Sequence, residues 1–298
     1  MSSSIQESVI DVEPVGRRPS RQLAGLWMHP GIVVCVLILL LLVAVSVAAP
    51  LLAPFDPLQI RPRARLQAPS WIHLFGTDGL GRDVLSRVLY GGQVSLLVGV
   101  LSAFVSAVLG TIIGLVAGFF RTLDAIMMRF IDGLMAIPSL LLAIAIVSLV
   151  GPSVVSIVAA ISIAELPRVV RLVRGVVLSV REATFVQAAV GLGIPNRLII
   201  VRHIFPNCLA PLVVQTTFMF AAAILAEAVL GFLGVGFPPE IPSWGNIIAD
   251  GRSVFQRAPW TVLCPSLVLS LTVLSVNILG DRLRDMLDPK FSKSASAQ

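Results

Sequence analysis

Long apolar runs alternate with short polar segments along the whole chain of 298 residues. About 20 consecutive apolar residues, at about 1.5 Å per helical residue, cross the hydrocarbon core of a bilayer. The segments that meet this pattern are 31–52, 94–120, 126–150, 209–235 and 260–279, and residues 154–164 begin a further span between the third and the last two. The sequence therefore predicts an all-α polytopic membrane protein with six transmembrane helices.

Polar segments divide the chain into regions between and around these spans. The expected regions are a cytoplasmic N-terminal tail over 1–30, a first transmembrane helix over 31–52, an outer loop over 53–93, a membrane core over 94–280 and a cytoplasmic C-terminal tail over 281–298. Near the end of the outer loop, Asp83 is expected to begin a short helix, since a carboxylate suits a helix N-terminus.

Two features of the core predict how its helices pack. Gly110, Gly114 and Gly118 recur every four residues, which is typical of a helix face that approaches another helix closely. Pro138 lies inside the third span and predicts a kink there, because proline cannot donate a helical hydrogen bond.

The segment 181–207 interrupts the apolar runs with a charged, helix-patterned stretch. Phe185, Ala188, Ala189 and Leu192 have the spacing of one helix face. Gly193 is expected to end that helix, Pro195 to begin a second helix at its first position, and Pro206 to end it. Two interpretations of this basic, amphipathic segment stay open: a connector on lipid headgroups, or an element that docks on another protein.

Composition and charge agree with a membrane protein. The chain is 56% hydrophobic and 13% charged, against about 25% charged residues in soluble domains. Its formal charge of +6 comes from basic residues scattered between apolar spans, so no nucleic-acid partner is expected. With both termini inside, cytoplasmic segments hold fifteen of the 22 lysines and arginines and outer segments hold seven. The positive-inside rule favours this orientation, although the first outer loop carries five arginines against the trend.

Motifs for bond-breaking chemistry are absent from the sequence. There is no GxxxxGK[ST] phosphate loop, no HExxH zinc motif and no GxSxG nucleophile turn. The three cysteines are widely spaced and form neither a disulfide framework nor a metal pattern. We therefore expect a non-catalytic protein without a metal or cofactor.

Ionisable residues inside apolar spans are functional-site candidates by default. Glu227 lies well inside the fifth span, where it either forms a structural hydrogen bond or lines a translocation path. Arg129 and Asp132, three residues apart in the third span, are expected to form a structural ion pair.

Three motifs carry a resemblance to a known family. Gln187-Ala188-Ala189, Gly193 and the ending His203-Ile204-Phe205-Pro206 resemble the EAA loop of bacterial ABC-importer permeases, although Gln187 stands where that loop has Glu. GTDGLGRDVLSRVLYG, which begins at Gly76, resembles the dipeptide/oligopeptide/nickel permease family, in particular the second permease of each pair. PSWG and NILGDRLRDMLDP extend the resemblance to about Phe291.

The resemblance implies the type I ABC-importer permease fold, a location in the bacterial inner membrane and a function in peptide transport. Implied partners are a second permease, two ABC ATPases, an outer solute-binding protein and membrane lipid. The implied coupling residues are Gln187, Ala188, Ala189, Gly193, Pro195 and Pro206. A stand-alone secondary transporter or channel is the alternative, which would favour an internal inverted repeat. A membrane-embedded enzyme would need a catalytic set that the sequence lacks.

Overall fold

The computed structural model describes residues 30–287, and every regular element within them is helical. The elements are α2 (Pro30–Val47), α3 (Ala49–Leu52), η1 (Pro62–Ala64), α4 (Val84–Phe119), α5 (Arg121–Ala136), α6 (Ser139–Val150), α7 (Val154–Arg181), α8 (Thr184–Gly191), α9 (Asn196–Ile199), the π turn η2 (Ile200–Ile204), α10 (Phe205–Phe232), α11 (Trp244–Arg252) and α12 (Trp260–Leu287). Residues 1–29 and 288–298, which make up most of the two predicted tails, lie outside the described residues.

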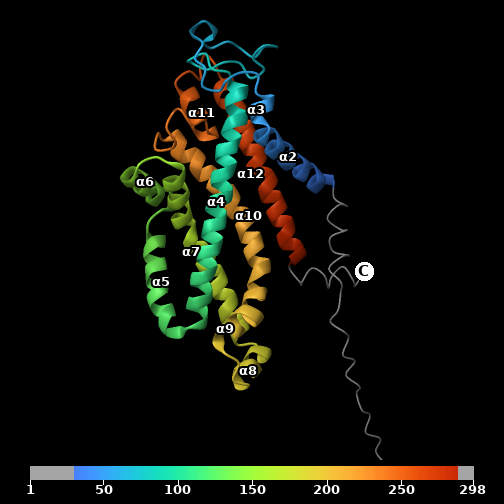
Figure 1. Cartoon of the computed structure of the whole chain (residues 1–298), viewed down its shortest axis with the longest axis vertical. Helices are drawn as coiled ribbons and strands as arrows, with labels where there is room; N and C mark the ends of the chain where they lie inside the picture. Colours follow the sequence, from blue (N-terminus) through green and yellow to red (C-terminus); the bar gives the residue numbers. More distant parts are fainter. Residues whose placement is uncertain (1–29, 288–298) are drawn as a thin grey trace, which may run out of the picture.

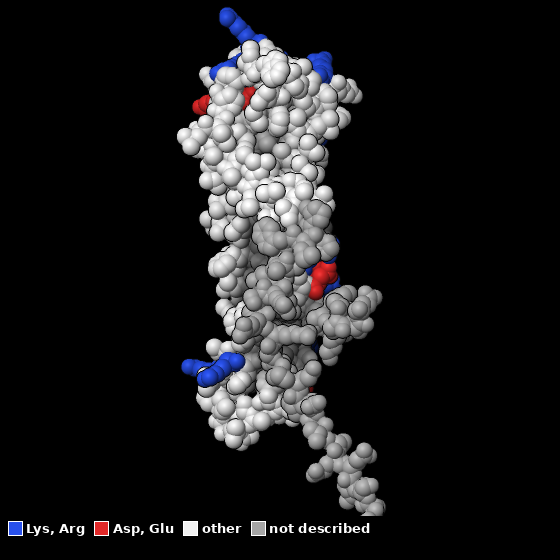
Figure 2. All heavy atoms as spheres, turned by 90° about the vertical axis from the view of Figure 1, so that its right-hand side faces the viewer, with Lys and Arg blue, Asp and Glu red and all other residues white. Residues whose placement is uncertain are grey.

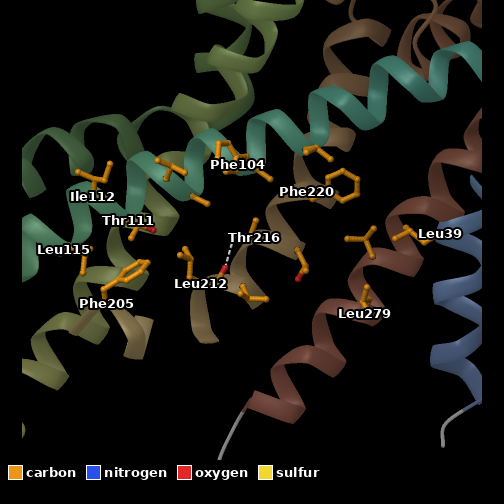
Figure 3. A pocket seen from close by; sticks show the side chains of 17 residues that line it. Leu39, Phe104, Thr111, Ile112, Leu115, Phe205, Leu212, Thr216, Phe220 and Leu279 are labelled. Carbon is orange, nitrogen blue, oxygen red and sulfur yellow. Dashed lines mark hydrogen bonds between the residues drawn. The ribbon is translucent and has the colours of Figure 1, made fainter. Parts of the chain in front are cut away.

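The long helices form an elongated bundle in which α4 runs beside α7 and α10, and α12 packs on α10 and α2 (Figure 1). Side chains of α2, α4, α10 and α12, among them Leu39, Phe104, Phe220 and Leu279, line an apolar pocket (Figure 3). One end of the bundle holds α3, α11 and the loop 53–83, and we refer to it as the α11 end. The opposite end holds α8 and α9, and we refer to it as the α8 end. On the face in Figure 2, charged side chains appear at the α11 end and in the half nearer the α8 end, with an uncharged zone between them. This distribution is typical of a protein with an apolar belt.

Three helical segments are long and apolar enough to cross a membrane: Val84–Phe119, Asn196–Phe232 and Trp260–Leu287. The pair α5 and α6 would make a fourth span if its two bent halves are counted together. Helix α2 is apolar but shorter, and α7 carries a row of charged residues in its second half. The all-helical prediction is confirmed over the described residues, whereas the number of six spans stays a prediction.

Several predicted boundaries are wrong because helices continue through polar residues or break at proline. The first predicted span is interrupted after Val47, and a separate short helix begins at Ala49 with Pro50 as its second residue. Helix α4 begins at Val84 instead of residue 94, with Asp83 as its N-cap; the Asp83 carboxylate accepts a hydrogen bond from the Ser86 amide. Helix α12 continues to Leu287, beyond the predicted end at 279.

The predicted kink at Pro138 is a full break. Helices α5 and α6 meet at 90° across Ile137 and Pro138, whose backbones are extended. The residue before a proline is disfavoured in the helical region, so the chain leaves the helix at Ile137 and begins a new helix at Ser139. The third predicted span is therefore two helices with different directions.

The most extensive helix contact, between α4 and α7, follows the glycines of α4. A methyl group built on Gly110, Gly114 or Gly118 would lie 2.5, 2.8 or 2.6 Å from the Cβ atoms of Val169, Val173 and Val177 on α7. Three valines, each four residues from the next, thus lie directly over three glycines with the same spacing. Ser106 extends this seam, because its hydroxyl donates to the Ser162 carbonyl oxygen at 3.1 Å. The predicted glycine face is confirmed, and its partner is α7.

We expect Gly110→Ala to destabilise the chain by about 1–3 kcal/mol, because the added methyl group overpacks the contact with Val169. The matched control is Gly133→Ala in α5, where the same methyl group meets no atom within 4 Å. The thermal unfolding midpoints of the purified variants in detergent measure the difference. Equal midpoints for the two variants would contradict a tight α4–α7 seam.

Candidate functional site

Helix α8 ends in a Schellman motif at the residue that the sequence predicts. Gly193 has φ +74°, its amide donates to the Val190 carbonyl at 2.9 Å, and the Ile194 amide donates to the Ala189 carbonyl at 3.2 Å. These two bonds satisfy carbonyl groups at the end of the helix and reverse the chain direction. Glycine adopts positive φ at little cost, whereas other residues do so with strain. Gly193 therefore sets the angle between α8 and the following turn.

The second half of this segment differs from the prediction. Pro195 is expected at the first position of the second helix, but it is the N-cap of α9, which begins one residue later at Asn196. Pro206 does not end the helix, because α10 continues through it to Phe232. A proline ring clashes with the carbonyl four residues earlier. The π turn Ile200–Ile204 widens the helix at that point, and the Phe205 amide donates to Ile200 five residues back.

The apolar face of α8 is divided between the protein interior and the surface. Val186 and Ala189 are buried and belong to a core cluster that also includes Val173, Val177 and Ile199. Of the four residues predicted to share one helix face, Phe185, Ala188 and Leu192 are exposed, whereas Ala189 is buried. Gln187 is also exposed and donates to the Glu182 carbonyl at 3.2 Å. Helix α8 therefore packs on α7 through one edge and leaves a second apolar edge uncovered.

The exposed apolar side chains at the α8 end come from α8 and from the elements that follow it. They are Phe185 and Val190 of α8, Leu192 directly after it, Leu198 of α9 and Val201 of η2, and Leu192 is 81% exposed. The basic residues Arg197 and Arg202 lie beside them and are also exposed. An exposed apolar edge beside basic side chains is typical of an interaction surface.

Glu227 is buried near the α11 end of α10, with 1% of its surface exposed. The Ser95 hydroxyl of α4 donates to its Oε2 atom at 2.8 Å, and the same hydroxyl oxygen accepts from the Trp244 amide at 3.2 Å. Trp244 is the first residue of α11, and its indole Nε1 donates to the Val88 carbonyl at 3.0 Å. The carboxylate thus connects α10 through one hydroxyl to the positive N-terminus of α11. Its other oxygen, Oε1, has no partner among the described residues. A role for Glu227 in a translocation path stays a prediction.

The predicted pair between Arg129 and Asp132 is wrong. Asp132 accepts from Arg171 on α7 at 2.7 Å, and no ion pair of Arg129 occurs within residues 30–287. An arginine placed before its acid on one helix is the less favourable order, whereas α7 presents its side chain across the helix contact. Arg174, one turn further along α7, forms a bidentate pair with Asp124 at 2.5 and 2.7 Å. The charged edge of α7 therefore holds α5.

An ion cluster at the α11 end, in which all members except Asp250 are buried, was not recognised from the sequence as a unit. Asp78 pairs with Arg82 at 2.6 Å and with Arg87 at 2.9 Å, and Asp250 of α11 pairs with the same two arginines at 2.9 and 3.0 Å. The guanidinium of Arg87 is almost fully buried. The GTDGLGRDVLSR motif supplies three of the four residues. The spacing of Asp78, Arg82 and Arg87 within this motif is the sequence signal from which these ion pairs could have been predicted. The cluster neutralises two of the five arginines that oppose the positive-inside rule in the first outer loop.

Comparisons with known proteins agree with this arrangement. The family of binding-protein-dependent transport system inner membrane components matches residues 106–293, and the N-terminal TM domain of oligopeptide transport permease C matches residues 24–69. The dipeptide transport system permease protein DppC of Alkalihalophilus pseudofirmus is 45% identical over 259 residues, which cover 87% of this chain and 85% of that protein. The di/tripeptide transport system permease protein DppC of Pseudomonas aeruginosa is 42% identical over 87% of this chain and 88% of its own length.

The fold also resembles a solved transporter. The inward-facing MetNI methionine ABC transporter has a chain that superposes with a TM-score of 0.55 at 18% identity, over 68% of this chain and 96% of that one. The chain belongs to the family of binding-protein-dependent transport system inner membrane components, and it is a membrane permease of the ABC transporter class. This membership favours the permease over the alternative of a stand-alone secondary transporter or channel.

We expect Asp78→Asn to destabilise the chain by about 3 kcal/mol, because two guanidinium groups then share one carboxylate. Asparagine keeps a carbonyl oxygen for the Leu80 and Arg82 amides, so the loss reports the charge. The control is Asp132→Asn, which removes an exposed ion pair and should change stability by less than about 1 kcal/mol. Thermal unfolding in detergent compares the two variants, and equal losses would contradict the structural importance of the cluster.

Proposed function

We propose that this chain is one of two permease subunits of an ATP-driven importer for di- and oligopeptides or similar small solutes. The observation that carries the proposal is the tip of the α8 end, where the EAA-like segment exposes an apolar edge beside basic residues. Such an edge fits a groove on a separate ATPase subunit, and the chain has no phosphate loop of its own. The relatives named for dipeptide and di/tripeptide transport support peptides as the substrate class.

The same proposal includes the topology and the partners. Six spans with both termini in the cytoplasm would direct the α8 end toward two ATPases and the α11 end toward an outer solute-binding protein. The excess of basic residues in the expected cytoplasmic segments supports this orientation. A second permease would complete the pore in the bacterial inner membrane, and ATP-driven closure of the ATPases would move the α8 end.

The division of labour has a direct test. We expect the purified chain alone to hydrolyse no ATP, and its complex with a second permease and the ATPases to hydrolyse ATP faster when a peptide-loaded solute-binding protein is added. Reconstituted vesicles should then accumulate labelled dipeptide only with ATP on the ATPase side. Hydrolysis by the rigorously purified chain, or a complex indifferent to any binding protein, would refute the proposal.

The coupling role of the α8 end rests on the angle at Gly193. We expect Gly193→Val to strain the Schellman turn by about 1–3 kcal/mol, because valine does not adopt positive φ readily. Membrane abundance and recovery of the second permease should stay normal, while peptide uptake and recovery of the ATPase fall. Ala188→Asp should have the same effect by placing a charge in an apolar contact.

Gly191→Val is the matched control for this experiment. Gly191 is two residues away, has no positive φ, and a Cβ there also meets no atom within 4 Å. The control adds the same side chain without the backbone strain, so it should retain most of the uptake. Wild-type uptake by both Gly193→Val and Ala188→Asp would show that the segment is only a surface connector.

A further inference from the structure

The turn Ser70–His73 at the α11 end exposes a run of apolar side chains. Trp71 is 98% exposed, Ile72 71% and Leu74 54%. Single exposed apolar residues are ordinary, but a large aromatic side chain beside two aliphatic ones forms a patch. Figure 1 shows the loop 53–83 beyond the ends of α4 and α12, so the patch lies past the apolar helices that would sit in lipid.

The turn is held in one conformation by contacts on its inner side. The Ser70 amide donates to the His73 carbonyl at 2.8 Å, and the His73 amide donates to the Ser70 hydroxyl at 3.2 Å. The buried His73 ring lies 2.8 Å from the Asp83 carboxylate and packs on Phe55, with 4.8 Å between ring centroids. The exposure of Trp71 therefore belongs to an ordered turn, and a partner that binds it meets a preorganised surface.

Basic side chains occur at the same end of the bundle as this turn. Five arginines at the α11 end have no ion-pair partner among the described residues: Arg61, Arg63, Arg65, Arg252 and Arg257. Among the described residues, three carboxylates are exposed at this end: Asp56, Glu240 and Asp250. Asp250 is already paired with Arg82 and Arg87, so only Asp56 and Glu240 offset the charge of the five arginines. The surface is therefore positively charged, and blue side chains are visible at this end in Figure 2.

Two contacts join the first loop to the segment that begins at the end of α11, where Arg252 and Arg257 lie. The Arg65 Nε atom donates to the Gly79 carbonyl at 2.6 Å, and Gly79 lies against Val254, 3.6 Å from a Cβ built on the glycine. Arg61 is fixed in turn over the Phe55 ring, 4.2 Å from its centroid. The two loops thus make one surface, which we name the Trp71 surface: Trp71, Ile72, Leu74 and the five arginines.

We infer, on the basis of the proposed function, that the Trp71 surface is the docking face for an acidic region of the solute-binding protein. Tryptophan and arginine are the residues that contribute most often to protein–protein binding energy. The family is described as dependent on a binding protein, and this surface lies at the end opposite the tip of α8. The positive charge attracts an acidic partner and speeds its approach, while Trp71 supplies the apolar contact.

The test uses the complete importer in lipid nanodiscs, with the purified solute-binding protein that stimulates the wild-type complex. Trp71→Ala should raise the binding-protein concentration for half-maximal ATPase stimulation about tenfold or more, with the maximal rate unchanged. The control Leu149→Ala truncates a side chain on α6 that is 89% exposed but lies outside the Trp71 surface, and it should leave both values unchanged.

The charge is tested with Arg63→Glu, which reverses an exposed arginine whose side chain makes no ion pair in the described chain. The association rate of the binding protein should fall about tenfold at low salt and approach the wild-type rate in about 0.5 M salt, where exposed charges are screened. An unchanged association rate at low salt would contradict an acidic partner region.

Four results overturn the inference in different ways. An unchanged half-maximal concentration for Trp71→Ala, in a complex that still responds to the binding protein, removes the Trp71 surface but leaves the proposed function intact. Reduced recovery of the second permease with Trp71→Ala would make this surface a permease–permease contact. Quenching of Trp71 fluorescence by brominated lipid in the nanodisc would make it a membrane contact. A wild-type complex that responds to no binding protein removes the proposed function and the docking face together.

Discussion

The close contact between α4 and α7 is the constraint on which the rest of the structure depends. Inside a bilayer, lipid tails are as apolar as the side chains, so helix association rests on close packing and polar contacts. The three glycines of α4 let the valines of α7 approach so closely that an added methyl group would not fit between the helices. Since α4 begins at the ion cluster and α7 leads directly into α8, this seam mechanically connects the two ends of the molecule.

The two ends are stabilised by different kinds of interaction. At the α11 end, buried ion pairs, the Ser95–Glu227 hydrogen bond and the Trp244 indole hold α4, α10 and α11 together. At the α8 end, a few buried apolar side chains hold one short helix, and its other apolar edge remains exposed. A firmly held end and a projecting one suit a permease that receives its solute at one side and its driving force at the other.

Ion pairs explain why several charged residues lie where the sequence pattern did not predict them. The sequence left the arginines of the first outer loop as an exception to the positive-inside rule, yet Arg82 and Arg87 are paired with Asp78 and Asp250. Likewise, Arg171 and Arg174 of α7 hold the carboxylates of α5 instead of lining a free edge. Ion pairs between distant segments therefore account for charges that a count along the chain treats as isolated.

The sequence by itself determined the helical class, the glycine seam, the N-cap at Asp83 and the helix end at Gly193, because each depends on local periodicity or on one residue's backbone freedom. The family motifs were also legible along the chain. Only the tertiary structure decided that α5 and α6 diverge by 90°, that Asp132 pairs with Arg171, and that α10 continues through Pro206. Those outcomes depend on which helices lie side by side, and the energy of a contact between distant residues is not written in the spacing of either one.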